Sequence, residues 1–336
     1  LRGSASCDSA YIPFVIGSPG FTDFVRRVET GTAVPHISSS QIKSFRFLLP
    51  PLPEQRAIAH ILGTLDDKID LNRQMSATLE AMARALFESW FVRFDPVRAK
   101  AEGRDTGLPA EIADLFPDRF EESEIGEVPK GWGTCALSDL FDISGGSQPP
   151  ASTFRDKQED GFVRLLQIRD FDSDSHLTFV PASPNLRIVD EDDVLVGRYG
   201  SGNGDPSDSL GRWLRGLSGA INVAIVRIIP ARRDLREFLS HYVGSGRFYR
   251  DIVGGSARAV QAGFRKADLA LLRIAKPPTL LLASFDEFAT VQWEQMKHLR
   301  RSSRHLRQLR DALLPKLISG DLRVPDAERF LADAGV

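Results

Sequence analysis

Apolar residues recur over residues 50–91 at alternating spacings of four and three, which is the heptad pattern of a coiled-coil helix. Pro50 and Pro51 mark its start, because proline suits the first helical turn, and Glu54 suits the positive end of the helix dipole. We therefore expect a long helix that begins at about Pro53. Its seam positions, two of them polar, are Ile58, Leu62, Leu65, Ile69, Asn72, Ser76, Leu79, Ala83 and Leu86.

The same pattern returns 227 residues later, so that Pro50 corresponds to Pro277. The register also extends backwards without a gap, since Phe21 corresponds to Phe248. An internal repeat this long indicates a duplicated domain rather than a repeat array. Because a heptad seam needs a partner, we expect residues 58–86 to pair with residues 285–313, antiparallel if a pseudo-twofold axis relates the repeats.

Between the two helices the pattern changes to short apolar runs of strand length, such as 162–166, 193–196 and 223–229, separated by turn residues. Residues 235–243 and 248–253 have a helical pattern instead. The expected fold class is α+β, with mixed α/β domains joined by two long helices that form an antiparallel coiled coil. The expected segments are a remnant of a first domain at 1–50, the first long helix at 51–94, a charged linker at 95–124, a second domain at 125–278, the second long helix at 279–320 and a tail at 321–336.

Residues 95–124 combine prolines and glycines with an excess of acids, which favours an exposed linker with one short helix.

Composition limits the possible partners and the compartment. The chain has 336 residues and a net charge of −2, so any nucleic-acid surface must be local. Cys7 and Cys135 are the only cysteines, which excludes a disulfide framework and fits a reducing cytosol. The sequence has no stretch apolar enough for a membrane helix or a signal peptide, and we expect a cytoplasmic protein.

Several motifs occur in a fixed order along the chain. One motif is Pro-Pro-Leu-Pro-Glu-Gln-Arg at 50–56, and another is Leu-Phe-Glu-Ser-Trp-Phe-Val-Arg-Phe at 86–94. The others are Ile-Gly-Glu-Val-Pro-Lys-Gly-Trp at 125–132 and Leu-Arg-Asp-Ala-Leu-Leu-Pro-Lys-Leu-Ile-Ser-Gly at 309–320. This ordered set resembles the specificity subunits of type I restriction-modification systems, and the resemblance spans nearly the whole chain.

The resemblance implies a non-catalytic subunit that reads a bipartite target in double-stranded DNA and recruits methyltransferase and restriction/translocase subunits. It also implies that the chain itself needs no cofactor, because the partner subunits would bind S-adenosylmethionine, ATP and Mg. Residues 11–49 match only the last part of a first recognition domain. We therefore expect either the C-terminal portion of a longer subunit or a half-type subunit.

One candidate DNA-binding segment flanks a glycine-rich stretch at 200–204. Arg198 and Tyr199 precede this stretch, and Arg212 and Arg215 follow it. Guanidinium and aromatic groups around a loop suit contacts with phosphates and base edges. The plainer alternative is a solvated loop with scattered arginines.

A second candidate segment is residues 241–276, where seven basic residues face two acids. Such local charge suits phosphate neutralisation. We expect Arg258 and Gln261 to read base edges, because their side chains fit guanine and adenine and because the resemblance places this loop against DNA. We expect Arg247, Arg250 and Lys266 mainly to hold phosphates, and Arg265 is a further DNA-binding candidate of this segment.

The sequence offers no catalytic or metal-binding constellation. It lacks a phosphate-binding loop ending in Lys-Ser/Thr, an amino-methyltransferase motif and metal-ligand spacing among its six histidines. Two alternatives to the resemblance are a self-contained methyltransferase or nuclease, which these absences disfavour, and a coiled-coil scaffold without DNA binding, which the basic segment disfavours.

Overall fold

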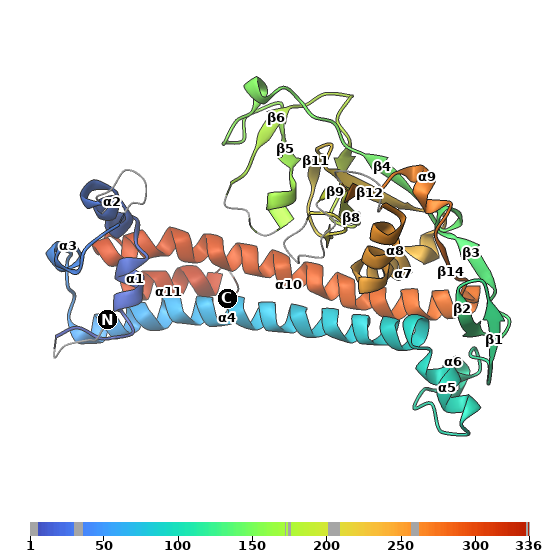
Figure 1. The fold of residues 1–336 in the computed structure, drawn as a ribbon. Helices are drawn as coiled ribbons and strands as arrows, with labels where there is room; N and C mark the ends of the chain where they lie inside the picture. The colour runs from blue at the N-terminus through green and yellow to red at the C-terminus, as the bar shows by residue number, and fades with distance from the viewer. Residues whose placement is uncertain are drawn as a thin grey trace. The chain divides into compact units, whose positions relative to one another are not determined.

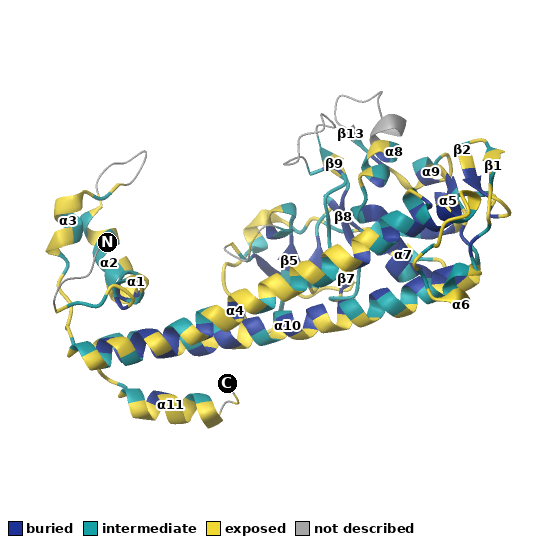
Figure 2. Cartoon of the chain, turned by 90° about the horizontal axis from the view of Figure 1, so that it is seen from below, coloured by how far each residue is buried: buried dark blue, intermediate teal, exposed yellow. Residues whose placement is uncertain are grey.

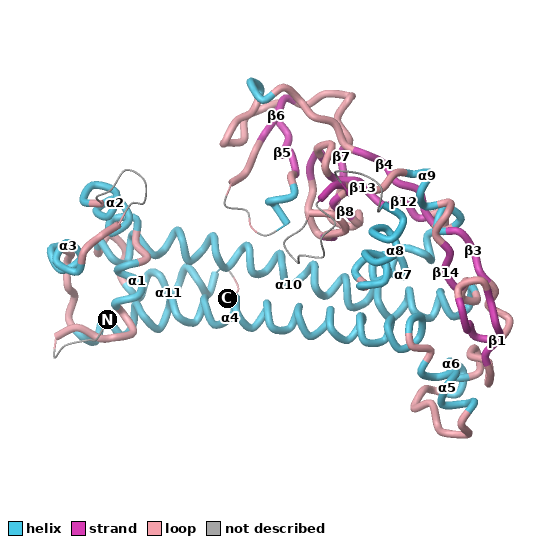
Figure 3. Tube along the Cα trace, in the orientation of Figure 1, coloured by secondary structure: helices cyan, strands magenta, loops and turns pink. Residues whose placement is uncertain are grey.

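The computed structural model describes residues 6–29, 36–171, 173, 176–200, 209–256, 262–333 and 335 (Figure 1). The chain forms two compact units. The first unit contains residues 1–79 and 295–336, and the second contains residues 80–294. Every named strand lies in the second unit (Figure 3).

The first long helix, α4 (Leu52–Phe87), begins one residue before the expected start. Gln55 is fully buried at its first turn, where its Nε2 donates to the Pro50 carbonyl at 2.8 Å and its Oε1 accepts from the Asp8 amide at 2.8 Å. A π-helical turn, η1 (Glu88–Val92), continues α4 directly.

In the first unit, α4 pairs with α10 (Thr279–Ser319) in antiparallel fashion, as expected. Asn72 Nδ2 donates to Ser302 Oγ at 3.2 Å, and Arg310 Nη1 donates to Asp66 Oδ1 at 2.7 Å. Residue numbers thus rise on one helix as they fall on the other. Buried and exposed positions alternate along both helices (Figure 2). The buried seam residues of this unit include Ile58, Leu62, Leu65, Ile69, Leu306 and Leu313.

In the second unit, the end of α4 and the start of α10 meet through aromatic side chains. The Phe285 ring lies 5.9 Å from Phe87 and 5.3 Å from Phe91, centroid to centroid. His241 packs edge-on against Phe285 at 5.3 Å, and burial lowers the pKa of its imidazole. These rings contribute the apolar centre that joins the helices to the strand-rich region.

The segment at 95–124 differs from the expected exposed linker. It contains two short helices, α5 (Asp95–Ala101) and α6 (Ala110–Ala113). Val97 is fully buried and Phe116 is 2% exposed, both within the main apolar cluster of the second unit. Lys100 Nζ donates to the Phe116 carbonyl at 2.8 Å, which links two distant parts of this segment. The many charged residues of this segment made its apolar face hard to recognise in the sequence. Tertiary packing buries that face.

Two four-stranded sheets form the centre of the second unit. The first has the order β10 (Trp213–Leu214), β8 (Leu195–Gly197), β12 (Ile225–Pro230), β4 (Phe141–Gly145), and all its pairs are antiparallel. The second has the order β6 (Phe179–Pro181), β5 (Phe162–Leu166), β11 (Gly219–Ile221), β7 (Ile188–Val189), with a parallel β11–β5 pair. The three expected strand runs therefore lie in or next to β5, β8 and β12.

Three two-stranded antiparallel ladders complete the strands. They are β1 (Phe120–Ser123) with β2 (Gly126–Pro129), β3 (Thr134–Ala136) with β14 (Arg273–Ala275), and β9 (Tyr199–Gly200) with β13 (Ala262–Gly263). Short 3₁₀ turns are η2 (Leu137–Asp139), η3 (Ala151–Thr153), η4 (Ile168–Phe171) and η5 (Arg233–Leu235).

The helices around the long pair repeat with the offset found in the sequence. The first unit contains α1 (Ile12–Ile16), α2 (Pro19–Val28) and α3 (Ser39–Ser44), and the second contains α7 (Arg236–Gly244), α8 (Gly246–Ser256) and α9 (Lys266–Leu269). Helices α2 and α8, α3 and α9, and α4 and α10 begin at 19 and 246, 39 and 266, and 52 and 279, so each pair starts 227 residues apart. The same local elements therefore form twice. The tail forms α11 (Val324–Asp333).

Among the described residues, none of the helices combines the length and the apolar character that crossing a membrane requires.

Candidate nucleic-acid interface

The β9–β13 ladder joins the two candidate DNA-binding segments. Tyr199 pairs with Gly263, and Gly200 pairs with Ala262. Arg198 Nε donates to the Phe264 carbonyl at 3.1 Å and extends this connection. Because the ladder is antiparallel, the chain leaves β9 and enters β13 at the same end. Residues 201–208, Arg258 and Gln261 lie outside the described residues, and the assignment of Arg258 and Gln261 to base edges stays a prediction.

Tyr199 presents an aromatic surface at this ladder. Its side chain is exposed, and the Arg198 guanidinium lies 5.2 Å from the ring centroid. Gly263 makes the close approach of the ring possible, because a Cβ at that position would lie 2.7 Å from Tyr199 Cδ1. An aromatic ring can stack on a base, and a guanidinium beside it can approach a phosphate.

The basic groups of α8 lie in different surroundings. Arg250 is exposed, whereas Arg247 Nε lies 3.6 Å from an Asp251 carboxylate oxygen. Asp251 also accepts a hydrogen bond from Tyr242 Oη at 2.8 Å. Burial, followed by the nearby Asp251 charge, holds the pKa of Tyr242 well above its ordinary value, so this phenol is a constant donor. Arg247 therefore has an acidic neighbour, and its charge is less available than that of Arg250.

Arg265 and Lys266 are exposed at the start of α9. The Arg265 amide donates to Asp268 Oδ2 at 2.7 Å, which caps the helix. Lys266 Nζ forms an ion pair with Asp142 of β4, and this hydrogen bond lowers the pKa of the Asp142 carboxyl. Exposed ion pairs of this kind are weak. Lys266 can therefore exchange its carboxylate for a phosphate.

The two remaining candidates follow residues 201–208 and differ sharply. The Arg212 guanidinium lies 5.9 Å from the Phe171 ring centroid. The Arg215 side chain is only 4% exposed and forms a two-pronged ion pair with Glu237, with Nη1–Oε2 and Nη2–Oε1 distances of 2.8 and 2.9 Å. Arg215 is thus an interior residue, and the expectation that it contacts DNA is corrected.

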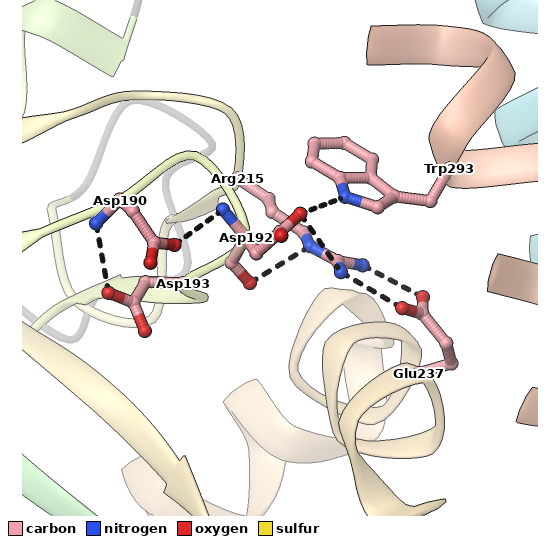
Figure 4. Close-up of polar contacts among 6 residues, drawn as sticks. All are labelled: Asp190, Asp192, Asp193, Arg215, Glu237 and Trp293. Carbon is pink, nitrogen blue, oxygen red and sulfur yellow. Dashed lines mark hydrogen bonds and ion pairs between the residues drawn. The ribbon is translucent and has the colours of Figure 1, made fainter. Parts of the chain in front are cut away.

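Arg215 joins three parts of the second unit (Figure 4). Besides Glu237 on α7, its Nε donates to the Asp192 carbonyl at 3.2 Å, and its guanidinium lies 4.1 Å from the Trp293 ring centroid on α10. Trp293 Nε1 closes the set by donating to Asp192 Oδ1 at 2.7 Å. The network connects α7, α10 and the turn before β8.

Hydrogen bonds from main-chain amides to aspartate side chains hold the turn at 190–193 (Figure 4). The Asp192 amide donates to Asp190 Oδ1 at 2.9 Å, and the Asp190 amide donates to Asp193 Oδ2 at 3.0 Å. Arg227 Nη1 donates to the same Asp193 oxygen at 3.3 Å. Sequence reasoning missed Glu237, Asp192 and Trp293; the one available signal was an acid inside the apolar helical stretch 235–243.

Asp286 on α10 gives a pH-dependent prediction. Burial, followed by the charge of Glu237, raises the pKa of its carboxyl above the ordinary value of 3.8. The stabilising contribution of this group is fully present below the unfolded-state pKa and is lost as the pH rises through the folded-state pKa. We expect Asp286→Asn to raise the Tm at about pH 7 and to leave it unchanged at pH values below about 3.8.

Thermal unfolding followed by circular dichroism across this range measures the effect. Glu287→Gln is the matched control, because Glu287 is an exposed acid on the same helix. A variant Asp286→Asn that is no more stable than the parent at neutral pH contradicts the prediction.

Within the described ranges, no group of three or more His, Cys, Asp and Glu side chains is placed to hold a metal ion.

Comparisons with known proteins converge on one family. A family model described as the type I restriction modification DNA specificity domain matches residues 23–81. The HindI specificity subunit of Haemophilus influenzae is 27% identical, and the match covers 86% of this chain and 71% of that protein. The MjaIX specificity subunit of Methanocaldococcus jannaschii is 21% identical over 95% of this chain and 70% of its own length.

The fold has a solved counterpart in the type I restriction-modification S subunit from M. genitalium. The TM-score is 0.53 at 13% identity, over 93% of this chain and 73% of that one. This similarity concerns the fold. The family model, the sequence relatives and the ordered motifs support a type I restriction-modification specificity subunit.

Proposed function

We propose that this chain reads double-stranded DNA through the β9–β13 ladder and the adjoining basic surface of α8 and α9. In this proposal residues 125–278 form the recognition domain for one half of a bipartite target. The paired helices would recruit methyltransferase and restriction/translocase subunits, which would bring S-adenosylmethionine, ATP and Mg. The chain itself would supply specificity and no catalytic group.

The observation that carries the proposal is the pairing of β9 with β13. It brings Arg198 and Tyr199 beside Gly263, which is followed within three residues by Arg265 and Lys266. Two basic segments far apart in the sequence thereby share one surface in a protein of net charge −2. Clustered positive charge with an exposed aromatic ring suits a phosphate backbone and its bases.

The repeat of α2, α3 and α4 as α8, α9 and α10 supports the bipartite part of the proposal. A duplicated recognition element matches a target with two separated half-sites, each read by one copy. Residues 1–50 would then belong to the domain that reads the other half. The antiparallel helix pair would keep the two readers at a defined separation.

The test is salt-dependent binding to a random DNA duplex, measured by fluorescence anisotropy. We expect Arg250→Ala and Lys266→Ala each to reduce the slope of log K against log salt by about one ion, because each removes one phosphate contact. Arg329→Ala on α11 is the matched control, since Arg329 is exposed and lies outside the proposed surface. Equal effects of all three substitutions, or binding without salt dependence, contradict the proposal and favour a scaffold.

A further inference from the structure

The turn at 222–224, which connects β11 to β12, exposes an apolar side chain. Ile221 and Ile225 on either side of it are fully buried, whereas Val223 between them is 43% exposed. Turns favour Gly, Pro, Asn, Asp and Ser, because these residues suit the turn backbone or form hydrogen bonds with it. Valine offers neither advantage, so the turn itself does not account for Val223.

Hydrogen bonds hold this turn in place. The Ile225 amide donates to the Asn222 carbonyl at 3.2 Å, which closes the turn. The Ala224 amide donates to Asn222 Oδ1 at 3.1 Å, and the Asn222 amide donates to the Leu166 carbonyl of β5 at 3.2 Å. The Val223 side chain therefore projects from a fixed backbone.

The main chain at 145–147 packs directly against the same turn. A Cβ at Gly146 would lie 2.1 Å from the Ile221 carbonyl oxygen and 2.3 Å from the Asn222 carbonyl oxygen. The Ser147 amide donates to the Ile221 carbonyl at 3.1 Å. Because the turn is already ordered, a ligand that contacts Val223 meets a low entropic cost of binding.

The turn adjoins the β9–β13 ladder at Arg198. The Arg198 amide donates to the Ala224 carbonyl at 2.9 Å, and Arg198 Nε donates to the Phe264 carbonyl at 3.1 Å. Arg198 is thus bonded both to the turn and to the residue that follows β13. The next residue, Tyr199, is 37% exposed. Val223 therefore lies next to the surface for which DNA reading is proposed.

An apolar side chain on such a surface has a specific target in the major groove. Base edges there display hydrogen-bond donors and acceptors, and thymine alone adds a methyl group, at C5. Charged and amide side chains read the polar edges, whereas apolar contact reads the methyl group. Since the valine side chain has no donor or acceptor, Val223 is suited to the methyl group.

We propose that Val223 is a specificity-determining residue that packs against the 5-methyl group of a thymine and selects a T·A pair at one position of the half-site. The inference rests on the proposed function, because it requires the ladder surface to face DNA. It adds an apolar reader to the basic and aromatic side chains of that surface. The contact with one methyl group corresponds to about a fourfold change in affinity.

The test begins with selection of a preferred duplex from a pool of random sequences by the complete chain. Each thymine of that duplex is then replaced in turn by deoxyuridine, which lacks only the methyl group. We expect one replacement to weaken binding of the parent by about fourfold in fluorescence anisotropy. The same replacement should leave the affinity of Val223→Ser unchanged, because that variant has no apolar contact to lose.

Val291→Ser is the matched control, since Val291 is a 61% exposed valine on α10, outside the proposed surface. It should respond to deoxyuridine as the parent does. Three results overturn the inference alone: a selected duplex without an A·T pair, no weakening by any deoxyuridine replacement, and a deoxyuridine effect that Val223→Ser retains. If the parent binds no DNA, or binds it without selecting a sequence, the proposed function fails together with the inference.

Discussion

Arg215→Met should lower the free energy of unfolding by about 3–5 kcal/mol, because it leaves the buried Glu237 carboxylate without its partner. Both side chains are almost fully buried, at 4% and 3% exposure. The substitution also removes the bond to the Asp192 carbonyl and the guanidinium that lies against Trp293. Urea unfolding of the complete chain, followed by tryptophan fluorescence and circular dichroism, measures the loss.

The double variant Arg215→Met with Glu237→Leu separates the cost of leaving one charge unpaired from the net contribution of the ion pair to the free energy of unfolding. Replacing both partners by apolar groups of similar size is often neutral or stabilising. We therefore expect the double variant to recover most of the stability that either single variant loses. Additive losses in this double-mutant cycle contradict the account, since they would mean that the two residues act independently.

Gly197→Ala should disrupt both folding and DNA binding. A Cβ at Gly197 would lie 1.9 Å from the Ser209 carbonyl oxygen and 3.0 Å from Ile168 Cδ1. The Gly197 amide donates to the Arg212 carbonyl at 2.7 Å, and its carbonyl accepts from the Gly211 amide at 2.9 Å, so the backbone cannot move aside without losing these bonds. Such overpacking costs about 1–3 kcal/mol or more.

Arg198 and Tyr199 follow Gly197 directly, and a displaced backbone would misplace them at the β9–β13 ladder. We expect DNA affinity to fall even in the fraction of protein that remains folded. Gly63→Ala is the matched control: nothing lies within 4 Å of its Cβ position, and it stands inside α4. It should stabilise the chain by about 0.5–1 kcal/mol. Equal Tm values for the two variants contradict this prediction.

The site could be predicted only in outline. The sequence singled out the basic residues around 198–215 and 247–266, because charge and aromatic character are visible in composition. It could not show that β9 pairs with β13, since strand pairing at a separation of about sixty residues depends on the whole sheet arrangement. For the same reason it could not distinguish Arg215, which is buried against Glu237, from Arg250, which is exposed.

The sequence by itself determined the two long helices, their heptad seams and the duplication, because heptad spacing, proline starts and a fixed 227-residue offset are local or periodic signals. Seam positions such as Leu62 and Leu65 are fully buried, as that spacing requires. Tertiary structure alone decided the burial of Val97 and Phe116, the Arg215 network and the meeting of the basic segments. These depend on which distant side chains pack together, and neither composition nor periodicity encodes that choice.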